Sequence, residues 1–205
     1  MATRLLLARH GQTEWHAENR YAGSSEVALT AEGLHQAEAL AGYARDAKPT
    51  ALFCSPQQRA IRTMEPTATA LGMTPTIVEG LRESHFGIAE GRTREELRET
   101  DPVALERFLA NPVDGAFPGS EPPAEVAARG VAALREVAAA ADGGTALVVA
   151  HNTLLRLVLC AMLGIPLRTY RTVFPRVDNV ALTELRIDGG NTALLRFNTP
   201  VNARY

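Results

Sequence analysis

The chain has 205 residues, of which 46% are hydrophobic and 21% charged, a composition typical of a globular protein with its own core. Its formal net charge of −2 excludes the domain-wide basic excess of a general nucleic-acid binder. The longest apolar stretch, residues 153–165, is interrupted by Arg156 and is too short to cross a bilayer, so no membrane partner is expected.

Other features of the sequence bear on compartment and domain organisation. Cys54 and Cys160 lie in apolar surroundings without metal-ligand spacing, so each is expected to be a buried thiol in a reducing compartment. Residues 1–4 run directly into an apolar segment and leave no room for the hydrophobic region of a signal peptide. The sequence therefore predicts a cytoplasmic protein, and without repeats or linkers it predicts one domain over residues 1–205.

Apolar runs and helix-capping residues divide the chain into alternating strands and helices. The predicted elements are, in chain order, a strand at 5–8, a helix from Thr30 to about Ala44, a strand at 51–54, a helix from Ser55 to Leu71, a strand at 75–78, short helices starting at Thr93 and at Asp101, a loop at 111–123, a helix at 124–141, a strand at 145–150, a helix at 153–163 and strands at 180–187 and 192–197. This alternation predicts an α/β three-layer sandwich, with a mainly parallel central sheet flanked by helices and an antiparallel pair at one edge.

Three helix starts carry specific signals. Thr30 is placed as an N-cap, and Thr93 with Glu96 forms a capping-box pattern. The segment 55–58 combines a capping Ser, Pro at the first helical position and Gln at the capping-box position. It predicts a helix that begins directly after Ser55.

Two of the buried strands end in histidine. Arg9 and His10 follow the strand at 5–8, and His151 follows the strand at 145–150. If these strands are neighbours, both imidazoles face one crevice at the carboxyl edge of the sheet. The helix after the strand at 51–54 adds Arg59, and the N-termini of this helix and of the one after His151 offer N–H groups to an anion. These groups predict a pocket of the size of a phosphate.

Ordered motifs that cover most of the chain resemble those of a known family. They are Arg9 to Trp15, Arg20, Gly23, Leu29 to Gly33 with Gln36 and Ala37, Ser55 to Ala60 with Thr63, Leu81 to Glu83 with Gly87, Glu90 and Gly91, and His151. The family is the histidine phosphatase superfamily, also called the phosphoglycerate mutase-like family. The resemblance implies a phosphoglycerate mutase-like fold.

The resemblance also implies a catalytic set. His10 would be the nucleophile that forms a phosphohistidine, and Glu83 would act as general acid and base. Arg9, Arg59 and a cationic His151 would hold the phosphoryl oxygens. No metal or other cofactor is expected, because these arginines and histidines supply the positive charge. His16, Ala22, Gly23 and Asn152 would contact the substrate.

Each assignment has a structural alternative. His10 could be a histidine with a purely structural role, and His151 could cap a helix. Arg59 could be a surface residue of its helix, and Glu83 a solvated loop carboxylate.

The chain departs from the family pattern at three positions. His16 stands where many relatives have Asn, Asn152 where many have Gly, and Ser84 where the mutase branch has Arg. Loss of that arginine removes an anchor for a second anionic substrate group, which favours a phosphatase over a mutase.

The leading hypothesis is therefore a metal-independent phosphatase for a small phosphorylated metabolite, in a monomer or homodimer. A phosphoglycerate mutase and a non-catalytic phosphate-binding module are the alternatives. Substrate specificity is expected to depend on the loop at 12–25, the Glu83 loop and the loop at 111–123.

Overall fold

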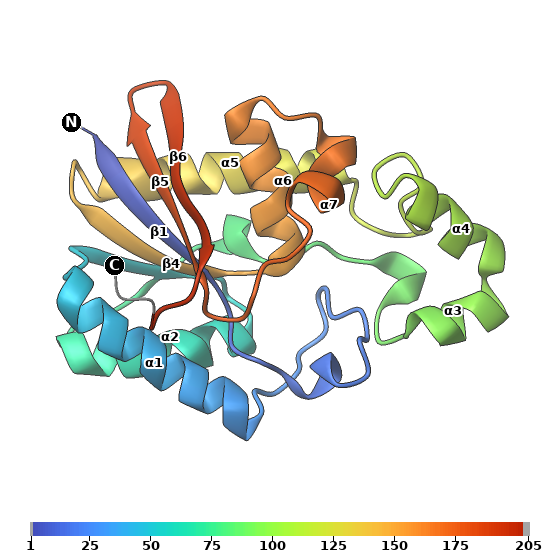
Figure 1. Ribbon diagram of the computed structural model, residues 1–205, viewed down its shortest axis with the longest axis horizontal. Helices are drawn as coiled ribbons and strands as arrows, with labels where there is room; N and C mark the ends of the chain where they lie inside the picture. Colours follow the sequence, from blue (N-terminus) through green and yellow to red (C-terminus); the bar gives the residue numbers. More distant parts are fainter. Residues whose placement is uncertain (1, 203–205) are drawn as a thin grey trace.

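A mixed sheet forms the middle layer of the molecule (Figure 1). The computed structural model describes residues 2–202, and within them six strands form one sheet in the order β3-β2-β4-β1-β5-β6. The strands are β1 (Thr3–Arg9), β2 (Ala51–Cys54), β3 (Thr76–Ile77), β4 (Thr145–Ala150), β5 (Leu182–Asp188) and β6 (Asn191–Thr199). β1 to β4 run parallel, and β5 and β6 pair antiparallel at one edge. The predicted α/β sandwich is confirmed.

The strands that end in histidine are neighbours, as the sequence analysis required. β1 and β4 pair in parallel with Arg9 opposite Ala150. The backbone N–H of His10 then donates to the carbonyl of Ala150 over 3.0 Å. His10 and His151 therefore leave the sheet side by side.

Helices cover both faces of the sheet (Figure 1). On one face lie α1 (Ala31–Ala47) and α2 (Gln58–Leu71), and on the other α5 (Pro123–Ala140) and α6 (Asn152–Leu163). Alternate residues of β1 divide between these layers, because side chains along a strand point to opposite faces. Leu5 and Leu7 pack in the cluster of α5 and α6, whereas Leu6 and Ala8 pack in that of α1 and α2. All four are at most 1% exposed, which makes β1 the centre of the core.

A smaller helical unit lies beyond the carboxyl edge of the sheet (Figure 1). It contains α3 (Arg94–Thr100) and α4 (Pro102–Ala110) and packs on its own aromatic cluster, in which Phe108 and Phe117 stack at 4.2 Å. The capping box of Thr93 and Glu96 at the start of α3 is confirmed. The remaining short helices are η1 (Glu14–His16), η2 (Glu79–Leu81), η3 (Gly87–Ala89), η4 (Leu167–Thr169) and α7 (Tyr170–Val173).

The prediction for the start of α2 is wrong. The helix begins at Gln58, and the cap position, Gln57, makes no side-chain capping bond. Ser55 lies outside the helix, where its hydroxyl accepts the N–H of Gln57 over 3.3 Å and contacts Nε2 of His151 at 2.7 Å. A tertiary contact with the neighbouring strand end has thus replaced the local cap.

Two further features agree with the sequence analysis. Cys54 and Cys160 are both buried free thiols. Within residues 2–202, none of the helices is long and apolar enough to cross a membrane.

Candidate active site

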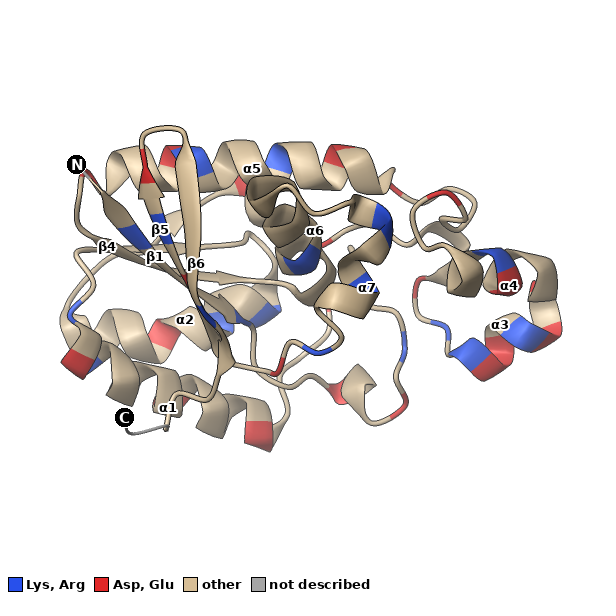
Figure 2. Cartoon of the chain, turned by 45° about the horizontal axis from the view of Figure 1, so that its top comes forward, with Lys and Arg blue, Asp and Glu red and all other residues tan. Residues whose placement is uncertain are grey.

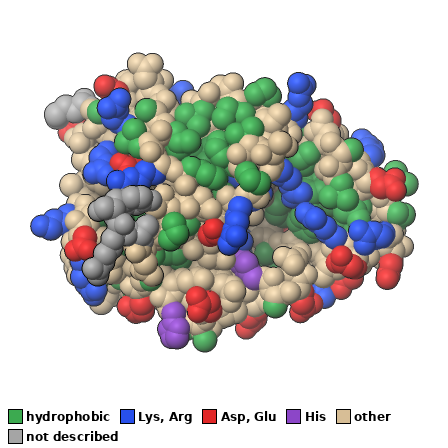
Figure 3. Space-filling model, viewed as in Figure 1, with side chains coloured by type: hydrophobic (Ala, Val, Ile, Leu, Met, Phe, Trp, Pro, Cys, Tyr) green, Lys and Arg blue, Asp and Glu red, His purple; other side chains and the backbone are tan. Residues whose placement is uncertain are grey.

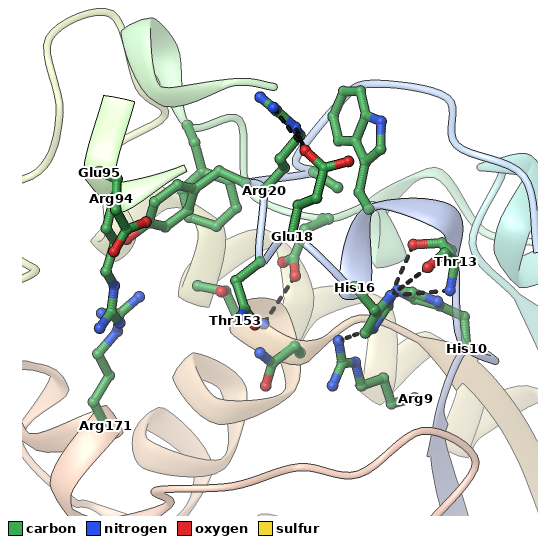
Figure 4. Close-up of a pocket in the computed structure, with 17 residues that line it drawn as sticks. Arg9, His10, Thr13, His16, Glu18, Arg20, Arg94, Glu95, Thr153 and Arg171 are labelled. Carbon is green, nitrogen blue, oxygen red and sulfur yellow. Dashed lines mark hydrogen bonds and ion pairs between the residues drawn. The ribbon is translucent and has the colours of Figure 1, made fainter. Parts of the chain in front are cut away.

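A cavity of about 470 Å³ opens at the carboxyl edge of β1 and β4 (Figure 4). The residues that line it come from the loop after β1, the Glu83 loop and the starts of α3, α6 and α7: Arg9, His10, Thr13, Trp15, His16, Glu18, Asn19, Arg20, Tyr21, Ala22, Glu83, Phe86, Arg94, Glu95, Asn152, Thr153 and Arg171. In the space-filling view a hollow on this face has a histidine near its floor and Lys or Arg side chains along one side (Figure 3).

His10 stands at the inner end of this cavity and is 6% exposed. Its Nδ1 lies 2.7 Å from the carbonyl of Gly11, an acceptor, so Nδ1 carries the proton and Nε2 the lone pair. Burial and the charges of Arg59 and Arg9 hold the pKa of His10 well below its usual value. The side chain is therefore a neutral imidazole whose Nε2 is available as a nucleophile.

Gly11 allows the loop after His10 to pack closely against the start of α1. A Cβ at Gly11 would lie 2.6 Å from the carbonyl oxygen of Gly33, at the start of α1. Such an approach excludes any side chain at this position. The tight packing of the loop on α1 fixes the direction in which His10 leaves β1.

His151 is fully buried against His10, with ring centroids 5.1 Å apart. The Ser55 hydroxyl accepts the N–H of Gln57, so its own proton is free for Nε2 of His151, which leaves Nδ1 as the protonated nitrogen. Nδ1 has no hydrogen-bond partner within the part of the chain that the structure describes. Burial and nearby cations hold the pKa of His151 well below its usual value, so the expectation of a cationic His151 is wrong for this structure.

Arg59 is also buried, at 1% exposure, and does not line the cavity. Its guanidinium donates to the carbonyls of Ala22, Gly23 and Ser25 over 2.8–2.9 Å. The surface-residue alternative for Arg59 is therefore excluded. Gly23 must be glycine, because a Cβ there would lie 2.3 Å from the backbone carbonyl oxygen of Ser84. Ala22 lines the cavity as expected, whereas Gly23 lies behind it.

Arg9 lines the cavity beside His10 and donates to the carbonyl of Val177 over 2.8 Å. Burial lowers its pKa to about 10, which keeps the guanidinium charged at neutral pH. The Nε atoms of Arg9 and Arg59 are buried and have no partner among residues 2–202. Nδ1 of His151 is a third buried nitrogen without a partner in this range, but of these three residues only Arg9 lines the cavity.

Glu83 is 6% exposed and lines the cavity next to the start of α6. Its Oε1 accepts the backbone N–H groups of Ser84 and Leu154, and its Oε2 accepts that of Thr153, each over 2.9 Å. The solvated alternative for Glu83 is excluded by these contacts. A carboxylate at a helix N-terminus is favoured by the free N–H groups and the dipole.

Three N–H groups of the predicted helix N-termini are not free to bind an anion. Glu83 holds the N–H groups of Thr153 and Leu154 in α6, and Glu26 accepts the N–H of Gln58 in α2 over 3.0 Å. This part of the prediction is wrong. The positive helix end that attracts phosphate attracts carboxylates of the same chain equally well.

His16 lies in the cavity, where its ring meets His10 edge-on at 5.9 Å. Its Nε2 faces two donors, Nη2 of Arg9 at 2.6 Å and Nδ2 of Asn179 at 3.3 Å, while its Nδ1 lies 2.9 Å from the backbone N of Thr13 and 3.2 Å from the carbonyl oxygen of the same residue. Burial and the charge of Arg9 lower the pKa of His16 to about 4. At this position the family pattern has Asn, and the imidazole here contacts Arg9.

Asn152, a second departure from the family pattern, lines the cavity as expected. Its side-chain Oδ1 is buried without a partner in the described part of the chain. This places a polar oxygen beside the start of α6.

The sequence analysis missed Gln57, whose buried side chain connects two loops of the site. Its Nε2 donates to the carbonyl of Gly23 over 2.7 Å, and its Oε1 accepts the N–H of Glu83 over 2.8 Å. The capping pattern of this segment assigns roles to Ser55, Pro56 and Gln58 and none to Gln57. Its contacts are with residues 26 and 34 positions away, which no local pattern reveals.

The segment 174–180 was also missed. Val177 accepts from Arg9, and Pro175 accepts from Arg156 over 2.9 Å. Asn179 donates to the carbonyl of His10 over 2.8 Å. This segment thus supports the backbone and the guanidinium at the end of β1, although its sequence carries no motif of its own.

Within residues 2–202, no group of three or more His, Cys, Asp or Glu side chains is placed to hold a metal ion. The positive groups around His10 are guanidiniums.

Comparisons with known proteins agree with this geometry. The sequence profile of the histidine phosphatase superfamily (branch 1) matches residues 5–200. The chain belongs to this superfamily. A probable phosphoglycerate mutase GpmB from Salmonella paratyphi C (strain RKS4594) is 32% identical over 181 residues, 88% of this chain and 83% of the relative.

Solved structures of the superfamily share the fold. Bacillus stearothermophilus YhfR superposes with a TM-score of 0.90 at 29% identity, over 96% of this chain and 97% of that one. The mycobacterial glucosyl-3-phosphoglycerate phosphatase Rv2419c superposes with a TM-score of 0.86 at 25% identity, over 97% and 100%. The chain is thus an enzyme of the histidine phosphatase type, as the resemblance implied.

Proposed function

We propose that residues 1–205 act as a single histidine phosphatase domain, which hydrolyses a small phosphomonoester through a phosphohistidine on His10. The neutral imidazole of His10 carries this proposal. Its Nδ1–H is held by the carbonyl of Gly11, its Nε2 has a lone pair, and the nearby guanidinium charges favour a phosphate group at that atom.

In the first step, Nε2 of His10 attacks phosphorus and the bond from phosphorus to the ester oxygen breaks. The departing alkoxide takes a proton from the Glu83 carboxyl group. Oε1 of Glu83 already accepts two N–H groups and Oε2 accepts one, so Oε2 has the lone pair that can carry this proton. The products of the step are a free alcohol and the phosphohistidine.

In the second step, water attacks the phosphohistidine in line with the bond from phosphorus to Nε2. Glu83, now a carboxylate, accepts the proton of the water, and His10 leaves as a neutral imidazole. Inorganic phosphate is released and Glu83 is again protonated for the next turnover.

The guanidiniums stabilise the charge of the transferring group. Arg9 and Arg59 contribute fixed positive charge, and the unpaired Nδ1 of His151 adds a donor next to His10. His16 has a different task in this scheme. Because its Nε2 contacts Nη2 of Arg9, it orients that guanidinium rather than donating to the phosphate.

The test is hydrolysis of p-nitrophenyl phosphate by the wild-type protein and by His10→Ala, with a chelator present in both assays. We expect activity that resists the chelator and falls at least ~10³-fold in the variant, as for removal of other catalytic nucleophiles. Rapid acid-free quenching with ³²P-labelled substrate is expected to trap a phosphoenzyme in the wild type. His35→Ala, at an exposed position of α1, is the matched control. Unchanged activity in His10→Ala contradicts the proposal.

A mutase is the second candidate, because a relative that is 32% identical is named a probable phosphoglycerate mutase. The same phosphohistidine would then pass its phosphoryl group to a second hydroxyl group instead of water. Incubation with 3-phosphoglycerate and a trace of 2,3-bisphosphoglycerate distinguishes the phosphatase activity from the mutase activity. Release of inorganic phosphate supports the phosphatase, and rapid equilibration with 2-phosphoglycerate supports the mutase.

A further inference from the structure

The end of the cavity far from His10 carries two arginines that face each other. Figure 4 shows the side chains of Arg94, from the first turn of α3, and Arg171, from α7, pointing toward one another across this end of the cavity. Arg9 and His10 lie at the opposite end in the same view. The two arginines are 77 positions apart in the chain, so only the fold brings them together.

Arg171 is held in place by an aromatic platform. Its guanidinium carbon lies 4.5 Å above the ring of Phe108, and its Nε donates to the hydroxyl of Tyr170 over 3.2 Å. Phe108 is 3% exposed and stacks on Phe117 at 4.2 Å, so the platform is rigid. The two terminal nitrogens of Arg171 remain available to a ligand.

The arginines are not neutralised by acidic neighbours. Within residues 2–202, neither Arg94 nor Arg171 forms an ion pair, although nine such pairs occur elsewhere. The segment 164–177, which includes α7, contains three arginines and no Asp or Glu (Figure 2).

Three carboxylates line the cavity, and they do not cancel this charge: Glu83 is held by backbone N–H groups beside the start of α6. Glu18 is paired with Arg20 at 2.7 Å, and Glu95 is a single carboxylate beside two guanidiniums. Facing cations repel each other unless an anion lies between them.

We propose that Arg171 and Arg94 form a second anion subsite, so that the substrate is a phosphomonoester with a carboxylate or a second phosphate at its other end. The inference rests on the proposed function, which places the phosphate to be cleaved at His10. A guanidinium can bind two oxygens of either a carboxylate or a phosphate in a bidentate manner. The Arg that the mutase branch has after its acid is absent here, and α7 supplies a cation from another element. The cavity of about 470 Å³ accommodates a metabolite of this kind.

The test compares matched substrates of increasing length. Each ω-carboxyalkyl phosphate, with two to about six methylene groups, is paired with the ω-hydroxyalkyl phosphate of equal length. We expect kcat/KM to favour the carboxylate by about ten- to a hundredfold at one length, the range of a charge-assisted contact. A parallel series of alkanediol bisphosphates decides whether the subsite prefers a carboxylate or a phosphate.

Variants assign the preference to the two arginines. Arg171→Gln and Arg94→Gln are expected to remove it through KM while the hydroxyalkyl phosphates react as before. Arg168→Gln and Arg98→Gln delete the same charge at exposed neighbouring positions outside the cavity and are the controls. Arg94 lies on an exposed helical turn, so its variant tests the idea even if Arg171→Gln fails to fold.

The outcomes separate this inference from the proposed function. Hydrolysis that depends on His10, with no preference for acidic substrates at any length, overturns the subsite alone. A preference that persists in both Gln variants also overturns it. Failure of all monoesters, neutral ones included, contradicts the proposed function instead.

Discussion

The two ends of the cavity are built in different ways. The inner site is defined as Arg9, His10, Arg59, Glu83 and His151. It lies at the ends of β1 and β4, in the first turn of α2 and in the Glu83 loop, and four of its five side chains are at most 6% exposed. The outer rim, defined as Arg94 and Arg171, lies on short helices, with Arg94 exposed and Arg171 half-buried.

The inner-site side chains also make more hydrogen bonds than those of the outer rim. Glu83 alone accepts three backbone N–H groups, and Arg59 donates to three carbonyls. Arg171 has one side-chain hydrogen bond among residues 2–202, and Arg94 has none. Several hydrogen bonds to one side chain fix its position, which catalysis requires. A rim side chain with few hydrogen bonds can be substituted without loss of the reaction. Changes to the inner site should therefore act on kcat, and changes to the rim on KM.

The largest effect is expected from Glu83→Gln. Gln cannot donate an acidic proton, so kcat for alkyl phosphates should fall about 10²–10⁴-fold. The loss should be smaller for p-nitrophenyl phosphate, whose leaving group needs no proton, and phosphohistidine should accumulate because water is not activated. Rapid-quench kinetics measure both effects. Glu79→Gln, at an exposed position of η2, is the control, and equal losses for the two substrate types would contradict the role of Glu83 as the acid.

A smaller effect is expected from Gln57→Leu, which removes the connection between Gly23 and Glu83. The variant leaves the buried N–H of Glu83 unpaired, which costs roughly 1–3 kcal/mol, while the carbonyl of Gly23 keeps its bond from Arg59. We expect kcat to fall about tenfold and Tm to fall by several degrees. Gln58→Leu changes the exposed neighbour and should do neither. A change in KM alone would show that Gln57 does not position the inner site.

The pH dependence of stability should report the buried histidines. The pKa values of His10, His16 and His151 are lowered in the folded chain, that of His16 to about 4, whereas unfolded histidine titrates near 6.5. Between these values the unfolded chain binds protons that the folded chain does not, so the free energy of unfolding falls as pH falls.

We expect Tm to drop by about 10 °C between pH 7 and pH 5. His16→Asn should reduce this drop, and His35→Asn should not, as differential scanning calorimetry would show. Identical curves for the wild type and His16→Asn would contradict the account of His16.

The smallest effect is expected from Thr93→Ala, which removes the cap of α3. Loss of an N-cap destabilises a helix by about 1 kcal/mol. Amide hydrogen exchange in α3 should become several-fold faster while β1 and β4 are unchanged. KM for acidic substrates should rise slightly, because the first turn of α3 holds Arg94 less firmly, and kcat should stay constant. Faster exchange throughout the sheet would show that the rim and the inner site are not independent.

Local patterns were sufficient for most of the fold. Apolar runs placed all six strands found within residues 2–202, and β1 and β4 became neighbours as expected. Capping patterns located Thr30 and Thr93, because those caps involve residues three positions apart. The pattern at Ser55 failed because the same hydroxyl was used by His151, 96 positions away.

The sequence by itself therefore determined the layers and the strand ends, since these depend on periodicity. The five inner-site residues were named by the resemblance of their motifs to those of the family. The tertiary structure alone decided which groups those residues meet. It filled the helix N-termini with Glu26 and Glu83, lowered the pKa values of the histidines through burial, and brought Gln57 and Asn179 to the site. It also set Arg94 opposite Arg171. Burial and long-range contacts are properties of the packed chain, and no short stretch of sequence contains them.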